Sequence, residues 1–325
     1  MDNSIHPMSL GDIFDRIFKL FTQTFVRNLI IAVIVFLPAG IMLTFALDWF
    51  FSTIAQIAAQ PGMINERWAA SMMAIFSAIG ISSITMILVM ISYLAGILGI
   101  TIVGCNQMSG QTITWQEALR ATFSVRLLRV FGQQFLQYLA ISAIILVPYI
   151  FLIIAIASES SSLSLISGLL LLAAAITAAY FVVQWILVLP VIAWEDATVM
   201  QSFKRSATLV RDFWWRTLGI YLLINIIAQF AISIVTTPLS IFAFWGFFSR
   251  FFGSMSSFSE GQLEPEMQLE ILQSLGSGIG ILIALSTVLS LLIIPLIATV
   301  MYFDLRARKD ELNRPEDIPI QPEQA

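Results

Sequence analysis

The sequence predicts an all-α, polytopic membrane protein with six transmembrane helices, and three observations lead to this fold class. Apolar residues make up 58% of the 325 residues and charged residues only 11%, whereas a soluble domain carries about 25% charged residues. Six apolar segments reach the roughly 20 residues that a membrane-spanning helix needs. Basic residues also alternate between the loops that join these segments, as membrane topology requires.

The six predicted spans cover the following segments, in chain order: 28–47, 78–104, 137–157, 168–194, 217–247 and 278–303. The apolar run that begins near Leu29 starts too late for a signal peptide, so we interpret it as a span. Residues 69–104 carry no charge, and a helix of that length exceeds the hydrocarbon thickness, so it projects outside or tilts. The fifth span is also long, and Pro238 is expected to bend it.

The distribution of Lys and Arg predicts that both termini are cytoplasmic. Fourteen of the 16 basic residues fall in the N-terminal segment, in the second and fourth loops and in the C-terminal segment. The first and third outer loops hold only Arg67 and Arg250. By the positive-inside rule both termini and the second and fourth loops of this multi-pass protein lie on the cytoplasmic side of the membrane.

Three amphipathic helices are predicted in the membrane interface, each after a helix cap. The caps are Ser9 with Asp12, Thr114 with Glu117 and Thr198 with Gln201, in which the side chains satisfy free N–H groups at the helix start. Apolar residues recur at helical spacing after each cap, with basic residues on the other face, which is typical of interfacial helices.

An internal threefold repeat follows from the caps: each unit would be an in-plane helix and a two-span hairpin, over residues 9–104, 114–194 and 198–303. The alternative is that the basic loops of any multi-span protein look amphipathic. The whole of 9–312 is expected to form a single membrane domain, between an N-terminal tail at 1–8 and a proline-rich, disordered tail at 313–325. The segment 265–275 is the best candidate for a small outer helix.

The few polar residues near the spans are the candidates for function. Glu195, Asp196 and Asp304 lie at the predicted cytoplasmic boundary. They either gate a path or bind a cation, or they pair at the rim with Arg205, Arg306 or Arg308; we favour pairing. Three amides are candidate buried polar groups that line a path or, more commonly, join helices by hydrogen bonds: Gln184, Asn225 and Gln229. The glycines of "GSGIG" at 276–280 permit close helix packing.

Enzyme chemistry finds no support in the sequence, so we expect a non-enzymatic protein without cofactor or metal. The chain has one histidine, His6, and one cysteine, Cys105, which excludes histidine clusters and multi-cysteine zinc sites. Cys105 is expected to be a small buried hydrophobic residue. No phosphate-binding glycine motif or nucleophile elbow occurs. The net charge of −4 argues against nucleic acid as a partner.

Membrane lipids are the expected partners, together with a membrane protein or a second copy of the chain. Basic residues near an anionic membrane surface contribute about 1 kcal/mol each. The candidate anionic-lipid contacts are Arg16, Lys19, Arg120, Lys204, Arg205, Arg211, Arg216, Arg306 and Arg308.

A family resemblance rests on three stretches: "SLGDIFDRIFKLFTQTFVRN" near the start, "LPVIAWEDATVMQSFKRSATLVRDFWWRTLGIYLL" and "YFDLRARKD" at 302–310. Over about residues 9–310 the chain resembles the membrane domain attached to some bacterial glycerophosphoryl diester phosphodiesterases, and the related YciC-like inner-membrane proteins. The string from Ser202 to Trp214 is the most specific part. The resemblance implies a multi-span, largely uncharacterised membrane domain. It does not imply phosphodiesterase activity, which belongs to a separate soluble barrel in that family.

The function predicted from these features is the organisation of lipids or partner proteins at the cytoplasmic leaflet. The alternative is a transporter or channel for a lipid or hydrophobic solute, because prolines at 38, 148, 190, 238 and 295 would break spans and broken spans form sites. An intramembrane enzyme is a third and weaker interpretation.

Overall fold

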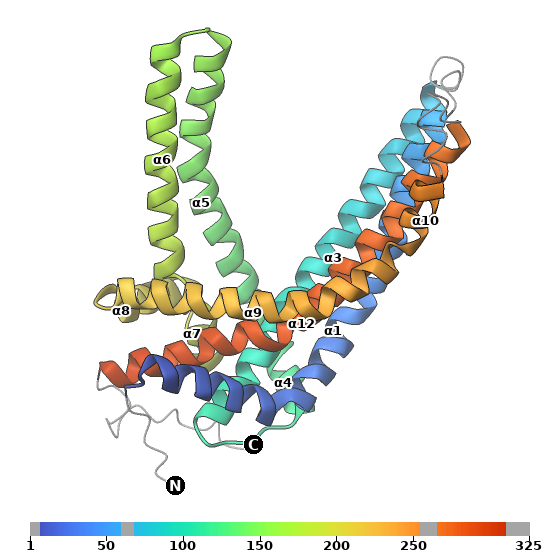
Figure 1. Ribbon diagram of the computed structural model, residues 1–325. Helices are drawn as coiled ribbons and strands as arrows, with labels where there is room; N and C mark the ends of the chain where they lie inside the picture. Colours follow the sequence, from blue (N-terminus) through green and yellow to red (C-terminus); the bar gives the residue numbers. More distant parts are fainter. Residues whose placement is uncertain (1–6, 60–67, 254–264, 310–325) are drawn as a thin grey trace. The chain divides into compact units, whose positions relative to one another are not determined.

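The computed structural model describes residues 7–59, 68–253 and 265–309, and in these ranges the only regular secondary structure is helical. Figure 1 shows the order of the helices along the chain. They are α1 (Leu10–Ala59), α3 (Trp68–Met108), α4 (Trp115–Thr122), α5 (Val125–Ala157), α6 (Ser161–Gln184), α7 (Val188–Glu195), α8 (Val199–Arg211), α9 (Trp214–Ala243), α10 (Trp245–Gly253) and α12 (Pro265–Arg308).

Six helical segments are long and apolar enough to cross a membrane, which is the architecture of a multi-pass membrane protein. They cover Leu10–Ile57, Trp68–Met108, Val125–Ala157, Ser161–Glu195, Trp214–Ala243 and Ser274–Arg308. Five of the predicted spans lie within these segments. The fifth was predicted to reach residue 247, but α9 ends at Ala243 and α10 begins at Trp245.

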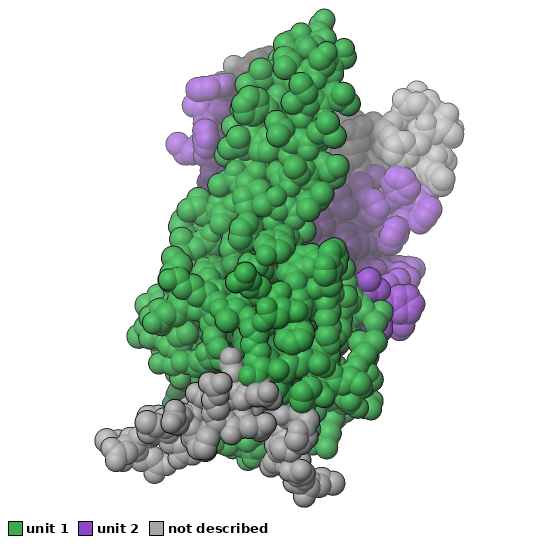
Figure 2. Space-filling view, turned by 90° about the vertical axis from the view of Figure 1, so that its left-hand side faces the viewer, with its two compact units in different colours: residues 1–24, 101–225, 295–325 green, residues 25–100, 226–294 purple. Residues whose placement is uncertain are grey.

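The chain divides into two compact units (Figure 2). Unit 1 comprises residues 1–24, 101–225 and 295–325, and unit 2 comprises residues 25–100 and 226–294. Four helices, α1, α3, α9 and α12, contribute residues to both units. This division does not follow the three consecutive segments of the predicted repeat, and the repeat stays a prediction.

A seam of small residues holds α1 and α12 together inside unit 2. A Cβ atom built on Gly276 would lie 2.7 Å from the Cα of Asp48, and one on Gly280 would lie 2.5 Å from the Cα of Thr44. One turn further along, a Cβ atom built on Gly40 would lie 2.9 Å from the Cβ of Ala284. The paired positions run in opposite directions at four-residue steps, so the two helices are antiparallel there and their backbones approach closely. The predicted role of the glycines at 276–280 is confirmed.

In unit 1, α5 and α6 form a helical hairpin, and a break in the chain separates α6 from α7. Pro190 in α7 has no N–H and cannot bond the carbonyl four residues earlier. Ser206 of α8 bridges the break: its hydroxyl donates to the carbonyl of Gln184 over 2.6 Å and accepts from the backbone N–H of Leu187 over 3.2 Å. Residues 185–187 therefore leave the helix without exposing these backbone groups.

All three predicted caps form. Thr114 and Glu117 make a reciprocal capping box at α4, and the backbone N–H of Thr198 donates to Gln201 at α8. At α1 the backbone N–H of Ser9 donates to the Asp12 carboxylate over 2.9 Å, so Asp replaces the usual Glu. The hydrogen bonds from Thr114 hold the pKa of the Glu117 carboxyl below its ordinary value.

Two of the three amphipathic segments are not built as predicted. The first is the N-terminal part of α1 and continues into the span without a break, because no proline or glycine interrupts the helix between Gly11 and Pro38. The second is divided at Phe123, where the hydroxyl of Ser124 bonds the carbonyl of Ala121 and caps the start of α5. The third corresponds to α8, a separate helix that ends at Arg211, although the predicted segment reached Trp214, which begins α9.

Proline breaks a span at one position only among the five considered. Pro38, Pro148, Pro238 and Pro295 lie inside continuous helices. The chain departs from helical structure only before Pro190. Of the five broken spans expected for a carrier, only the one that contains Pro190 is broken. The segment 265–275, predicted as a separate outer helix, is the start of α12.

Candidate functional site

Asp304 is the centre of a buried polar network in unit 1. Its side chain is 1% exposed and accepts from three donors: Nη1 of Arg216 at 2.5 Å, Nε of Arg308 at 3.1 Å and the backbone N–H of Met8 at 2.7 Å. The carbonyl of Met8 in turn accepts from both arginines. The network joins the segment before α1 to the start of α9 and the end of α12, so its role is structural.

Glu195 forms a second network with the same end of α12. Its carboxylate accepts from Nε of Arg205 at 3.2 Å and from the hydroxyl of Tyr302 at 2.5 Å. Arg306 donates to that hydroxyl over 3.1 Å, and its guanidinium carbon lies 5.5 Å from the centre of the Tyr302 ring. Arg306 is only 4% exposed. Its prediction as a lipid contact is wrong, because packing against Tyr302 places it inside the protein.

Asp196 pairs with two arginines that the sequence did not connect to it. Its Oδ1 accepts from Nε of Arg126 at 3.0 Å and from Nη1 of Arg129 at 2.8 Å. Rim pairing was predicted correctly for Glu195 with Arg205 and for Asp304 with Arg308. The sequence did contain a signal for the pairing of Asp196. Helix α5 carries two arginines three residues apart and no carboxylate, so these arginines need a partner from another helix or loop.

Five of the nine predicted lipid contacts have no carboxylate within ion-pair distance in the described part of the chain. Four of them are exposed and one, Arg16, is half-buried; the set is Arg16, Lys19, Arg120, Lys204 and Arg211. Arg205, Arg216 and Arg308 are 29%, 28% and 21% exposed and are held by carboxylates. These three are committed to internal ion pairs, which lowers their capacity to bind headgroups.

Arg16 and Lys19 line a pocket of about 260 Å³ in unit 1, between the first turns of α1 and the end of α3. Leu20 and Gln23 extend the α1 side, and Gln107, Met108 and Gly110 form the α3 side. The side-chain amide of Gln107 donates a hydrogen bond to the side-chain oxygen of Gln23 over 3.4 Å. Gly110 has a φ of 82°, the left-handed conformation by which glycine ends a helix. Two cations and two amides therefore face one small space.

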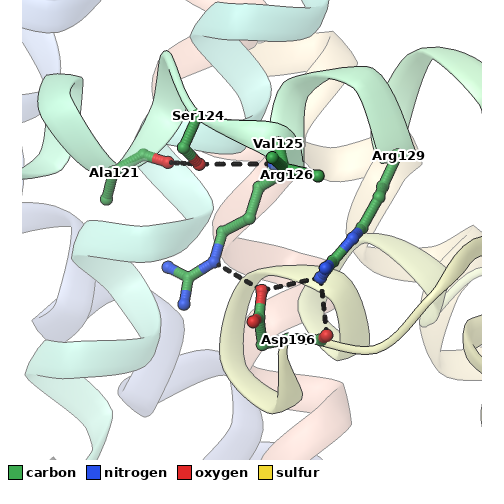
Figure 3. Close-up of a pocket in the computed structure, with 6 residues that line it drawn as sticks. All are labelled: Ala121, Ser124, Val125, Arg126, Arg129 and Asp196. Atoms are coloured by element: carbon green, nitrogen blue, oxygen red, sulfur yellow. Dashed lines mark hydrogen bonds and ion pairs between the residues drawn. The ribbon is translucent and has the colours of Figure 1, made fainter. Parts of the chain in front are cut away.

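A second, shallower depression of about 440 Å³ surrounds the Arg126–Asp196–Arg129 cluster (Figure 3). Ala121, Ser124 and Val125 complete its lining, at the break between α4 and α5. The close-up shows Arg126 and Arg129 bonded to Asp196 from opposite sides. The two depressions share no lining residue.

The three amides proposed as buried polar groups do not gather in the structure. Gln184 donates to the hydroxyl of Tyr180, and Asn225 donates to the carbonyl of Tyr221, each four residues earlier in the same helical segment. Both amides are half-buried, and Gln229 is exposed, so its predicted burial is wrong. Hydrogen bonds within one helix satisfy the first two groups without a second helix.

Cys105 is fully buried and lies in unit 1, as predicted for a small hydrophobic residue. Among the described residues, no group of three or more His, Cys, Asp or Glu side chains is arranged to hold a metal ion. No protein-family model, no curated protein and no solved structure matches the chain.

Proposed function

We propose that this protein is a non-enzymatic, multi-pass protein of the bacterial cytoplasmic membrane that gathers anionic lipids at the cytoplasmic leaflet. Both termini would lie on that side, as the alternation of basic loops predicts. We also propose kinship with the membrane-domain family named above. The protein would also bring partner proteins together at the same leaflet, where these partners bind the lipids that it has gathered.

The pocket of Arg16 and Lys19 is the observation that carries the proposal. Both cations line it, and no carboxylate in the described residues lies within ion-pair distance of either. Asp12, one turn before Arg16, is occupied by the Ser9 cap instead. A lipid phosphate placed there would neutralise two adjacent like charges and accept from two amide groups, which is the usual chemistry of phosphate recognition.

The exposed cations outside the pocket support the same function. Lys204 and Arg211 lie on α8, whose apolar residues Leu209 and Val210 are buried within the protein. Arg120 lies on α4. Each such side chain near an anionic surface contributes about 1 kcal/mol, so they would hold anionic lipids around the pocket without a fixed geometry.

The transporter alternative has less support among the described residues. The amides that would line a path bond within their own helices, and four of the five prolines leave their helices continuous. The two cavities described above contain no residue from the uncharged middle of a predicted span. We therefore propose lipid binding in preference to transport.

Lipid binding to the purified protein in nanodiscs tests the proposal. The double variant Arg16→Gln/Lys19→Gln should weaken enrichment of phosphatidylglycerol over phosphatidylcholine by about thirtyfold, since two basic residues at about 1 kcal/mol each contribute about 2 kcal/mol. The measurement is the ratio of the two lipids that co-purify from mixed bilayers, determined by mass spectrometry.

The control for this test is Arg250→Gln, which removes a cation from unit 2 and leaves the pocket intact. It should leave the lipid ratio unchanged. If the wild-type protein shows no preference for the anionic lipid, or if the double variant retains the full preference, lipid gathering by this pocket is refuted.

A further inference from the structure

The arginines of the second depression are fixed in place but only partly neutralised. The Asp196 carboxylate accepts from one nitrogen of each arginine, Nε of Arg126 and Nη1 of Arg129. Nη1 of Arg129 also donates to the backbone carbonyl of Asp196 over 2.6 Å. The cluster therefore keeps a net charge of +1. In Figure 3 the two terminal nitrogens of Arg126 are directed away from Asp196 and carry no hydrogen bond to the other residues drawn.

Guanidinium groups that are held in place but only partly neutralised can bind a second oxyanion besides the Asp196 carboxylate, either planar or tetrahedral. Arginine binds carboxylate and phosphate through paired N–H groups, and Asp196 already shows that the two side chains converge on one anion. Their exposed fractions of 29% and 25% leave them accessible from the depression. The carboxylate orients each guanidinium, so less conformational entropy is lost when a ligand binds.

The break between α4 and α5 makes room for this ligand. If the amphipathic segment were one helix, as its pattern suggests, no turn would lie beside the arginines. Instead α4 ends at Thr122 and Ser124 caps the start of α5, and both Ser124 and Val125 line the depression. The start of the 33-residue α5 helix adds a partial positive charge on the same side.

We propose that the depression lined by Arg126, Arg129 and Asp196 binds a single phosphate group, with Arg126 as the main ligand and Asp196 as the positioning residue. The group belongs either to a lipid headgroup or to a free phosphate, which share this chemistry. The site is independent of the Arg16–Lys19 pocket, because the two share no residue, and either can fail without the other.

The full-length protein in phosphatidylcholine nanodiscs is the material for the test. Three probes are titrated by calorimetry: inorganic phosphate, dihexanoyl phosphatidic acid and dihexanoyl phosphatidylglycerol. Arg126→Gln should weaken binding of the preferred probe about tenfold, because a charge-assisted pair is lost, and Arg126→Lys should restore only part of it because lysine lacks the paired donors.

Arg250→Gln is the control: it removes one cation from helix α10, lies outside the depression and is not one of the candidate lipid contacts. It should bind the preferred probe like the wild type, and an unchanged melting temperature of Arg126→Gln shows that its fold is intact. Tighter binding of inorganic phosphate than of either lipid assigns a soluble ligand, and the reverse assigns a headgroup. No binding of any probe, or equal losses in Arg126→Gln and Arg250→Gln, would overturn the proposal.

Discussion

Units 1 and 2 have similar apolar helices but are held together by different means. Unit 2 contains three of the 16 basic residues, Arg27, Arg67 and Arg250, and the other thirteen belong to unit 1. In unit 2 the backbones of α1 and α12 meet across glycine, threonine and alanine. In unit 1 the buried or half-buried carboxylates of Glu195 and Asp304 join segments that are 10 to 296 residues apart in the chain.

The comparison teaches that many of the charged residues of unit 1 have a structural role. Asp304, Glu195 and Asp196 each bind arginines, and these pairs use five of the thirteen cations of unit 1. Only the cations left outside these pairs, or left partly unneutralised by them, are available to a ligand. A count of basic residues alone therefore overestimates the number of lipid contacts.

The largest expected effect comes from breaking the polar network of unit 1 with Asp304→Asn. This change leaves Arg216 and Arg308 without their carboxylate, and we expect the free energy of unfolding to fall by about 3 kcal/mol. That is the lower end for broken buried pairs, because both guanidinium groups are partly exposed and can be hydrated. Thermal unfolding in detergent, followed by tryptophan fluorescence, gives the measurement.

Asp48→Asn is the matched change in unit 2, because Asp48 is exposed and forms no ion pair within the described residues. It should alter stability by less than about 0.5 kcal/mol. Equal losses for the two variants would show that the network around Asp304 does not hold unit 1 together.

A smaller effect is expected from closing the gap in the unit 2 seam with Gly280→Ala. The added methyl would lie 2.5 Å from the Cα of Thr44, and overpacking of this kind costs about 1–3 kcal/mol. The better helix propensity of alanine offsets about 1 kcal/mol of that cost. We therefore expect a net loss of about 1 kcal/mol in the same unfolding assay.

The same substitution in unit 1 should have the opposite sign. Gly168 of α6 has no atom within 4 Å of a built Cβ, so Gly168→Ala gains helix propensity without a clash, about 0.5–1 kcal/mol. If Gly280→Ala stabilised the protein as much as Gly168→Ala does, the close approach of α1 and α12 would be refuted.

The sequence predicted the spans and caps because these depend on local pattern. Continuous apolar segments, the Thr114–Glu117 box and the glycines at 276–280 can each be recognised within a few residues of the chain. The continuity of α1 was missed because an amphipathic segment and a span can share one helix when no breaker lies between them.

The candidate sites were predicted only in part because they depend on contacts distant in sequence. Asp196 meets Arg126 and Arg129 from 70 and 67 residues away, and no local pattern specifies that distance. Arg306 has the composition of a headgroup ligand, but the ring of Tyr302 and the fold around it bury the side chain. Arg16 and Lys19 were predicted as contacts, whereas their pocket also requires the end of α3.

The central claim is that the cations of unit 1 face one side of the membrane, and site-directed labelling tests it most directly. In a Cys105→Ser background, single cysteines replace four exposed residues, Gln111, Lys204, Glu159 and Ser249. An impermeant maleimide added to intact cells should label the cysteines at 159 and 249 and leave those at 111 and 204 unlabelled until the membrane is opened. Labelling of position 204 from outside, or of 111 and 204 from opposite sides, would contradict the account.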